Sequence, residues 1–214
     1  ICQINFSVFI GCGRNLPYDI ILENNILRGE IYMVLENAIC NVKIFVDDTY
    51  TVDSTNNQTY DLVINPQNFD HNDIYKTFSV HIDLFYKVIK IALVGSCYSI
   101  DTDCAILDGE ILTVLQDDTI LQIKVTDGSL LRCKKIVCSG CNYGIYKIKK
   151  GYIIYGETEI IMLDFEFNKI WNFSGKNIFV SLTKKNSFEL GENSIKLYDF
   201  DDNFYEIDFS GNLI

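Results

Sequence analysis

Two cysteines three positions apart are the strongest candidates for chemistry in the sequence. Cys138 and Cys141 enclose Ser139 and Gly140, and Cys133 precedes them. The C-x-x-C spacing is typical of zinc knuckles and of redox-active dithiols. A structural zinc site needs four ligands, and the sequence has neither a second C-x-x-C nor a close pair of histidines. We therefore expect no metal or redox centre at this position.

No other motif predicts catalysis. His71 lies in a polar segment and His81 in an apolar one, and neither accompanies a nucleophile motif such as G-x-S-x-G. The acidic segment 200–203 resembles a calcium loop but lacks its twelve-residue ligand pattern and closing glutamate. Gly-rich phosphate loops are absent, and nothing singles out two of the 29 carboxylates for glycoside hydrolysis. The sequence thus predicts no catalytic, cofactor-binding or metal-binding residue.

The composition indicates a β protein that binds neither nucleic acid nor an anionic membrane. Aromatic residues reach 13%, and together with many isoleucines and valines they favour strands. The net charge of -11, without an evident cluster of Lys and Arg, argues against binding to nucleic acid or to an anionic membrane. No apolar run approaches the ~20 residues that span a bilayer.

The eight cysteines are irregularly spaced and no export signal is visible, so we expect reduced thiols and a cytoplasmic location. Because the sequence begins at Ile1 rather than Met, an exported form stays open as an alternative.

An internal repeat organises the second half of the chain. Residues 156–165 read GETEIIMLDF and residues 191–200 read GENSIKLYDF, with five of ten positions identical. Phe-Ser-Gly follows each copy, at 173–175 and 209–211, and a third Ser-Gly occurs at 139–140. The Ser-Gly pairs are 35 and 36 residues apart, which is typical of a repeat architecture.

Each unit divides into four short apolar runs joined by turn residues, so the repeat predicts three four-stranded antiparallel meanders. The expected strands are 104–107, 111–115, 120–125 and 130–138 in the first unit; 145–148, 152–155, 160–165 and 170–173 in the second; and 179–182, 187–190, 195–200 and 204–209 in the third.

The segment Leu163 to Trp171 (LDFEFNKIW), followed by Phe-Ser-Gly, resembles a blade of the quinoprotein-like and WD-type β-propeller class. The resemblance implies that Asp164, the following turn and Trp171 lock neighbouring blades together. Tyr205 stands near the Trp position in the third unit, and Lys124 replaces the Asp in the first. The resemblance implies no activity and no quinone cofactor, because a partial set of blades lacks the closed ring that holds it.

The first hundred residues also predict strands, at 30–35, 41–46, 60–64, 78–84 and 88–94, with a short helix near Pro17–Leu27. Residues 78–96 fit strands three and four of a blade, with Asp83 at the Asp position. Three meanders do not close a propeller. The N-terminal part is therefore either degenerate blades or a separate β-sandwich. The polar insert 53–59 favours the sandwich and hence two subdomains, 1–100 and 101–214.

The leading functional hypothesis is a non-enzymatic protein-interaction module. One specific version is an acidic immunity- or antagonist-type protein that neutralises a basic toxin. The alternative is a carbohydrate-binding or carbohydrate-processing β protein, which rests on Trp171 and thirteen tyrosines. An open sheet edge also predicts contact with a second copy of the chain.

Overall fold

The computed structural model describes residues 32–96, 103–181 and 186–214 and folds them into sixteen β-strands without a helix. The strands form four sheets that follow one another along the chain. The expected all-β class, built of antiparallel meanders with propeller-like repeats, is confirmed. The helix expected near Pro17–Leu27 lies outside the described residues.

The first sheet contains the five strands expected in the N-terminal part: β1 (Tyr32–Glu36), β2 (Asn41–Val46), β3 (Leu62–Ile64), β4 (Lys76–Asp83) and β5 (Val88–Gly95). Their order is β1-β2-β4-β5-β3, and β3 alone pairs in parallel. Strands β1, β2, β4 and β5 form one antiparallel meander, and the insertion 47–75 adds β3 at its edge. The described N-terminal residues therefore take the degenerate-blade form.

The second and third sheets are four-stranded meanders at the expected places. The second consists of β6 (Ala105–Asp108), β7 (Ile111–Gln116), β8 (Thr119–Lys124) and β9 (Leu130–Lys135). The third consists of β10 (Asn142–Ile148), β11 (Gly151–Gly156), β12 (Ile160–Leu163) and β13 (Lys169–Phe173). In each sheet the strand order equals the chain order, so β9 and β13 are outer edge strands.

The last sheet has three strands: β14 (Phe188–Leu190), β15 (Ser194–Tyr198) and β16 (Phe204–Asp208). The strand expected at 179–182 is not formed as far as residue 181, where the description stops. The amide of Phe179 donates instead to the carbonyl of Glu157 in the third sheet (2.6 Å), and its ring is fully buried between the two sheets. This segment therefore connects the sheets.

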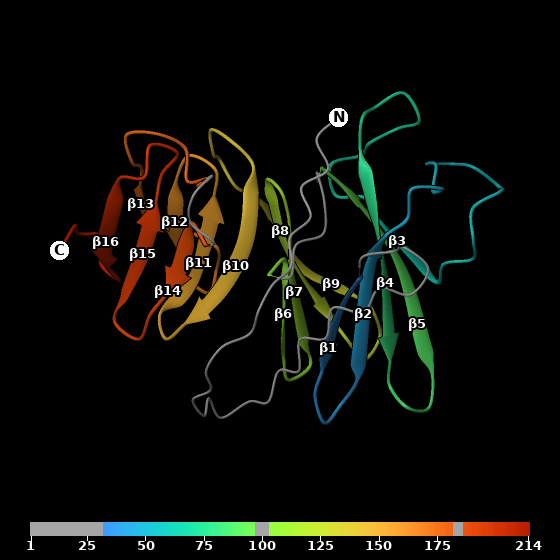
Figure 1. The fold of residues 1–214 in the computed structure, drawn as a ribbon. Coiled ribbons are helices and arrows are strands. Elements are labelled where there is room, and N and C mark those ends of the chain that lie inside the picture. Colours follow the sequence, from blue (N-terminus) through green and yellow to red (C-terminus); the bar gives the residue numbers. More distant parts are fainter. Residues whose placement is uncertain (1–31, 97–102, 182–185) are drawn as a thin grey trace.

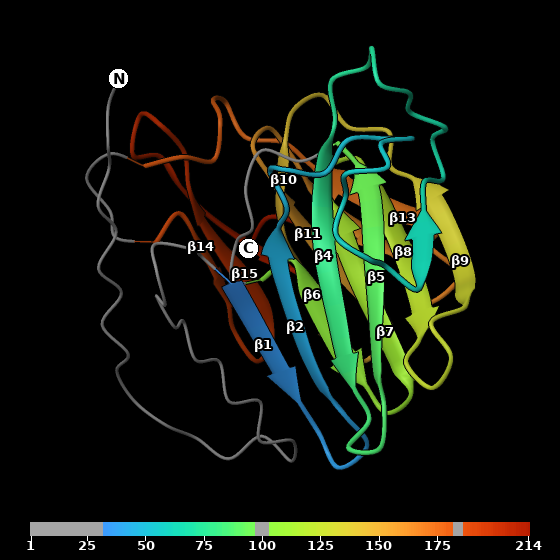
Figure 2. The ribbon, with the colours of Figure 1, turned by 90° about the vertical axis from the view of Figure 1, so that its right-hand side faces the viewer.

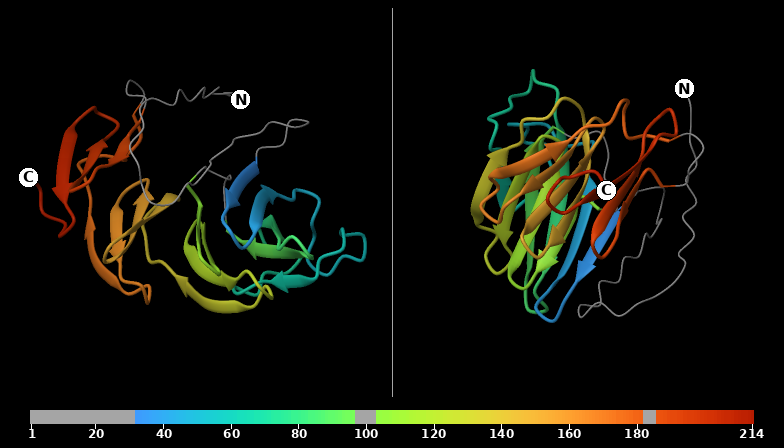
Figure 3. Two further views of the ribbon diagram at one scale, coloured as in Figure 1. Left: turned by 90° about the horizontal axis from the view of Figure 1, so that it is seen from below. Right: turned by 90° about the vertical axis from the view of Figure 1, so that its left-hand side faces the viewer.

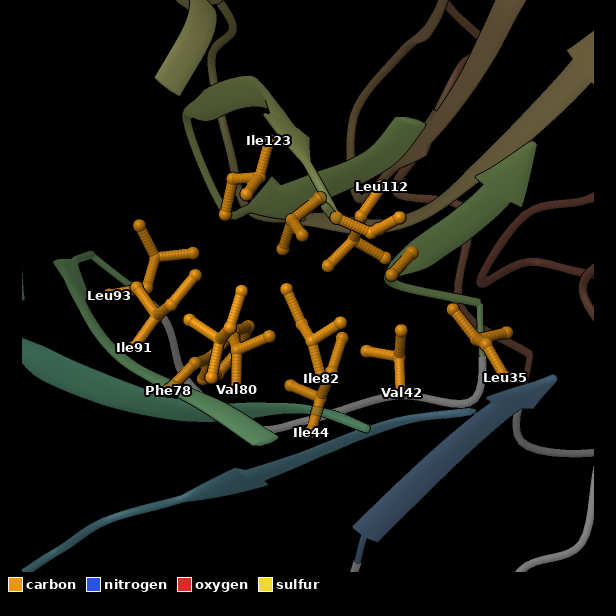
Figure 4. Packing of buried hydrophobic residues seen from close by; sticks show 14 of the residues in the cluster. Leu35, Val42, Ile44, Phe78, Val80, Ile82, Ile91, Leu93, Leu112 and Ile123 are labelled. Carbon is orange, nitrogen blue, oxygen red and sulfur yellow. The ribbon is translucent and has the colours of Figure 1, made fainter. Parts of the chain in front are cut away.

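The four sheets stand face to face along an open arc (Figures 1 and 2). Seen from below, the first and last sheets lie at opposite ends of the arc (Figure 3). Apolar clusters fill the space between each sheet and the next. The first cluster joins Phe78 and Val80 to Leu112 and Ile123 (Figure 4), so one core contains residues from both sides of position 100.

The position of a sheet in the arc explains its sequence pattern. A middle sheet has neighbours on both faces, and all four residues of β12 are buried. Such a strand reads as a continuous apolar run. The last sheet has one neighbour, so in β15 the buried Ile195 and Leu197 alternate with the partly exposed Lys196 and Tyr198.

Two five-residue turns of the form Asp-Phe-x-x-Asn close corresponding hairpins, at 164–168 and 208–212. In each, one oxygen of the aspartate accepts from the backbone N–H of the third and fifth residues. The fourth residue has a left-handed backbone, with φ of 65° at Phe167 and 86° at Gly211. After the second turn the chain runs back beside β16, where Leu213 forms an isolated antiparallel β-bridge with Ile207.

The third unit is consequently shifted by one strand from the expected alignment. Arg132 of β9 donates to the carbonyl of Phe165, in the first turn, and Trp171 of β13 donates to the carbonyl of Phe209, in the second. The turn at 208–212 therefore occupies the position in the last sheet that the turn at 164–168 occupies in the third sheet. Strands β14 to β16 are the first three strands of their unit, and the expectation that they are the last three is wrong.

Candidate interaction surface

The outer strands β9 and β13 each expose a large aliphatic residue at an irregularity of the sheet. In both sheets the register with the preceding strand shifts by one residue, which leaves Leu131 and Ile170 without a partner on the neighbouring strand. Each is a β-bulge residue at the same place in its sheet. A bulge bends the strand and re-aims a side chain, and it is best treated as a built feature.

The two bulges direct apolar side chains into solvent. Leu131 is 51% exposed and Ile170 is 55% exposed. A single exposed leucine is unremarkable on any protein surface. The repetition is informative, because two successive sheets use the same irregularity to expose a large aliphatic residue at the same position.

A cavity of about 150 Å³ lies between β9 and the strands β12 and β13. Its floor is apolar and includes Ile161, Leu163 and Phe167, all of which are buried. We call this cavity, with the exposed faces of β9 and β13 beside it, the outer groove. An apolar group from another molecule that enters this hollow leaves water, which is favourable.

Three lysines line the outer groove. The ammonium of Lys134 donates to Asn168 Oδ1 (2.9 Å) across the groove, and Lys135 forms an ion pair with Asp118 (2.8 Å). Lys169 lines the cavity from β13. Lys134 and Lys135 are adjacent in the sequence, but Lys169 is distant and joins them only through the packing of two sheets.

The nearest carboxylates offset part of this local charge. Asp118 is already paired with Lys135, and Asp164 is engaged by its own turn, where Asn168 and Glu166 donate to it. Those hydrogen bonds hold the pKa of Asp164 below its usual range, so it stays ionised at neutral pH and its charge also attracts Lys134. The groove therefore combines an apolar floor with a cationic border in a chain of net charge -11.

The C-x-x-C segment is structural in its contacts. The thiol of Cys138 donates to the carbonyl of Gly140 (3.2 Å), accepts from Asn142 Nδ2 (3.1 Å), and packs against the second core cluster. Burial raises the pKa of the Cys138 thiol, which makes the reactive thiolate scarce at neutral pH. Within the described ranges, no group of three or more His, Cys, Asp or Glu side chains is arranged to hold a metal ion, and no disulfide joins Cys138, Cys141 or Cys133.

The contacts of the histidines and of the acidic turn are also structural. His81 Nε2 lies 3.1 Å from Ser79 Oγ, and burial together with Lys90 and Lys43 lowers its pKa, so it is neutral at pH 7. His71 lies in an exposed turn. In the segment 200–203, Asn203 donates to Asp199, whose carboxylate also accepts from Tyr205 Oη (2.7 Å). The structure does not bring these groups together.

Sequence reasoning found Trp171 and missed the bulge residues. Trp171 joins two sheets, as the resemblance implied, and Arg132 takes the corresponding position in the second sheet. Tyr205 donates to Asp199 of its own sheet, accepts from the backbone N–H of Lys176 (3.0 Å) and packs edge-on against Phe173 of the third sheet. A bulge adds one residue to a strand whose side chains otherwise alternate between its two faces. This extra residue, at 130–132 and at 169–171, was the only sign of the bulges in the sequence.

This chain has little similarity to known proteins. No family model matches it, and no curated protein matches it. One solved structure that resembles it is BamB from Moraxella catarrhalis, with a TM-score of 0.42 and 7% sequence identity over 86% of this chain and 60% of that chain. The chain thus spans less than two thirds of that structure. In the described part of the chain, no helix is long and apolar enough to cross a membrane.

Proposed function

We propose that this chain is a non-enzymatic module that binds another protein through its outer groove. The supporting observation is the pair of equivalent bulges that expose Leu131 on β9 and Ile170 on β13, the two outer strands whose lysines line the cavity. Aliphatic residues held in fixed positions beside an apolar hollow are suited to the centre of a protein interface.

The narrower proposal of an acidic immunity- or antagonist-type protein is supported by the net charge of -11. The charge at the outer groove has the opposite sign, so a basic toxin would have to bind elsewhere on the surface. The glycan alternative relied on thirteen tyrosines and on Trp171, which is the chain's only tryptophan. Its indole packs on Gly211 and bonds to Phe209, so it does not form an open stacking platform.

The experiment is affinity capture with matched variants. The purified chain is immobilised as wild type, as Leu131→Asn/Ile170→Asn, and as Ile74→Asn, because Ile74 is 97% exposed on the insertion and lies outside the groove. Bound proteins from a lysate of the source cells are identified by mass spectrometry. We expect a protein that is retained by the wild type and by Ile74→Asn and lost from the double variant. The proposal fails if every captured protein binds the double variant equally well.

A further inference from the structure

The outer groove has a size and a charge that define the ligand it fits. A cavity of about 150 Å³ is the size of an engineered core cavity that takes up benzene, so it holds one side chain rather than a large ligand. The buried floor of Ile161, Leu163 and Phe167 favours an aromatic or aliphatic side chain. The anchor is therefore a single large apolar residue.

The lysines determine what flanks that anchor. Lys134 and Lys135 approach from β9 and Lys169 from β13, so cations stand on both sides of the cavity. All three side chains belong to exposed residues, and their present partners are an amide oxygen for Lys134 and Asp118 for Lys135. An amide oxygen is a weaker partner for an ammonium group than a carboxylate is. Carboxylates next to the anchor would replace it.

From this geometry we infer that the outer groove binds an acidic peptide segment, in which one large apolar residue enters the cavity and the flanking carboxylates meet Lys134 and Lys169. The inference rests on the proposed function and specifies the chemistry of the partner. The anchor residue supplies affinity through apolar burial, and the carboxylates supply orientation and speed of association. The chain's own negative charge makes such a site selective, because acidic segments are repelled by most of its remaining surface.

The test uses the whole chain and a fluorescein-labelled peptide, Glu-Glu-Phe-Asp-Asp, with binding followed by fluorescence anisotropy. We expect saturable binding, and about a tenfold weakening when Phe is replaced by Ser in the peptide. The charge variants are Lys134→Glu and Lys169→Glu. Their matched control is Lys150→Glu, an exposed lysine in the β10–β11 turn with the same change in charge. We expect roughly tenfold weakening from either groove variant and little change from the control.

Three results would overturn the inference. Equal weakening by Lys150→Glu and Lys169→Glu would show that the peptide senses only net charge. Equal binding of the Phe and Ser peptides would show that the cavity takes no anchor. Competition by single-stranded oligo-dT as effective as that by unlabelled peptide would assign the lysines to a nucleic acid. The proposed function is judged separately, since capture can depend on Leu131 and Ile170 while this peptide does not bind.

Discussion

The indole nitrogen of Trp171 donates a 3.2 Å hydrogen bond to the carbonyl oxygen of Phe209 and so joins the third sheet to the last. The ring also lies against the backbone of Gly211, where an added Cβ would stand 2.8 Å from Cδ2 of the indole. Arg132 makes the corresponding link one sheet earlier, and its guanidinium covers the ring of Phe167 at 5.4 Å. Each outer strand thus sends one side chain to the turn of the next sheet.

Trp171→Phe and Trp171→Ala separate the two parts of this link. Trp171→Phe keeps an aromatic ring over Gly211 and removes the hydrogen bond, which should cost about 1 kcal/mol of unfolding free energy. Trp171→Ala also removes the packing and should cost about 3 kcal/mol, since the side chain is only partly buried. Urea unfolding measures both. Equal losses in the two variants would contradict a separate contribution from the ring.

The strands were predictable because their burial between neighbouring sheets produces simple patterns of apolar residues in the sequence. Strand β12 of a middle sheet is an apolar run and β15 of the last sheet alternates, and both patterns are legible in the sequence. The sequence could not predict which strands of the last unit β14 to β16 are. Segments 156–165 and 191–200 share five of ten residues, yet the first ends at a turn between strands three and four and the second at a turn between strands two and three.

The reason is that one turn chemistry serves both kinds of hairpin. Asp-Phe-x-x-Asn occurs at 164–168, 199–203 and 208–212, and each aspartate accepts from the amide of the fifth residue. The turn therefore identifies a hairpin without saying which pair of strands it joins. The structural counterparts Asp164 and Asp208 are 44 residues apart, longer than the period of 35 to 36 that the Ser-Gly pairs suggested.

The outer groove was beyond the reach of sequence patterns for a different reason. Leu131 and Ile170 are exposed because of a register shift, and register is a property of two strands together. Likewise, Lys134 and Lys169 line one cavity only because neighbouring sheets pack face to face. Local sequence contains neither relationship.

Gly151 is predicted to be the least replaceable glycine among the described hairpins. Its φ of 148° places a hypothetical Cβ 1.9 Å from the carbonyl oxygen of Leu163, so any side chain must displace β12. Gly109 opens the equivalent hairpin of the second sheet, with φ of 56° and nothing within 4 Å of its Cβ. We expect Gly109→Ala to cost about 1 kcal/mol, from the left-handed backbone alone, and Gly151→Ala about 3 kcal/mol or more. Thermal and urea unfolding compare the two, and similar losses would contradict the argument from β12.

Two adjacent aspartates in the β7–β8 turn provide the pH-dependent prediction. Asp118 accepts hydrogen bonds from Gln67 and Ser96 (both 3.2 Å), on the side of the first sheet. Asp117 accepts from the backbone N–H of Asn142 (3.0 Å), at the start of the third sheet. Burial raises the pKa of Asp117. Burial also opposes ionisation of Asp118, but the hydrogen bonds from Lys135 and Thr119 outweigh it and lower its pKa.

The two shifts have opposite consequences for stability. A carboxyl group with a lowered pKa stabilises the fold above its unfolded pKa of about 3.9, and that contribution is lost as the pH falls through the folded value. One with a raised pKa costs stability at neutral pH, and the cost disappears as the pH falls towards about 3.9. At pH 7 we therefore expect Asp118→Asn to destabilise the protein by about 1 kcal/mol, because the ion pair with Lys135 is lost.

Asp117→Asn keeps an oxygen for the Asn142 amide and a residue type that tolerates the left-handed φ of 51°. It should leave stability unchanged at pH 7 or raise it by less than about 1 kcal/mol. Urea midpoints at pH 7 and pH 3 test both variants, and at pH 3 each should approach the wild type. The assignment is wrong if Asp117→Asn destabilises at pH 7 as much as Asp118→Asn does, because both carboxylates would then be stabilising in their ionised form.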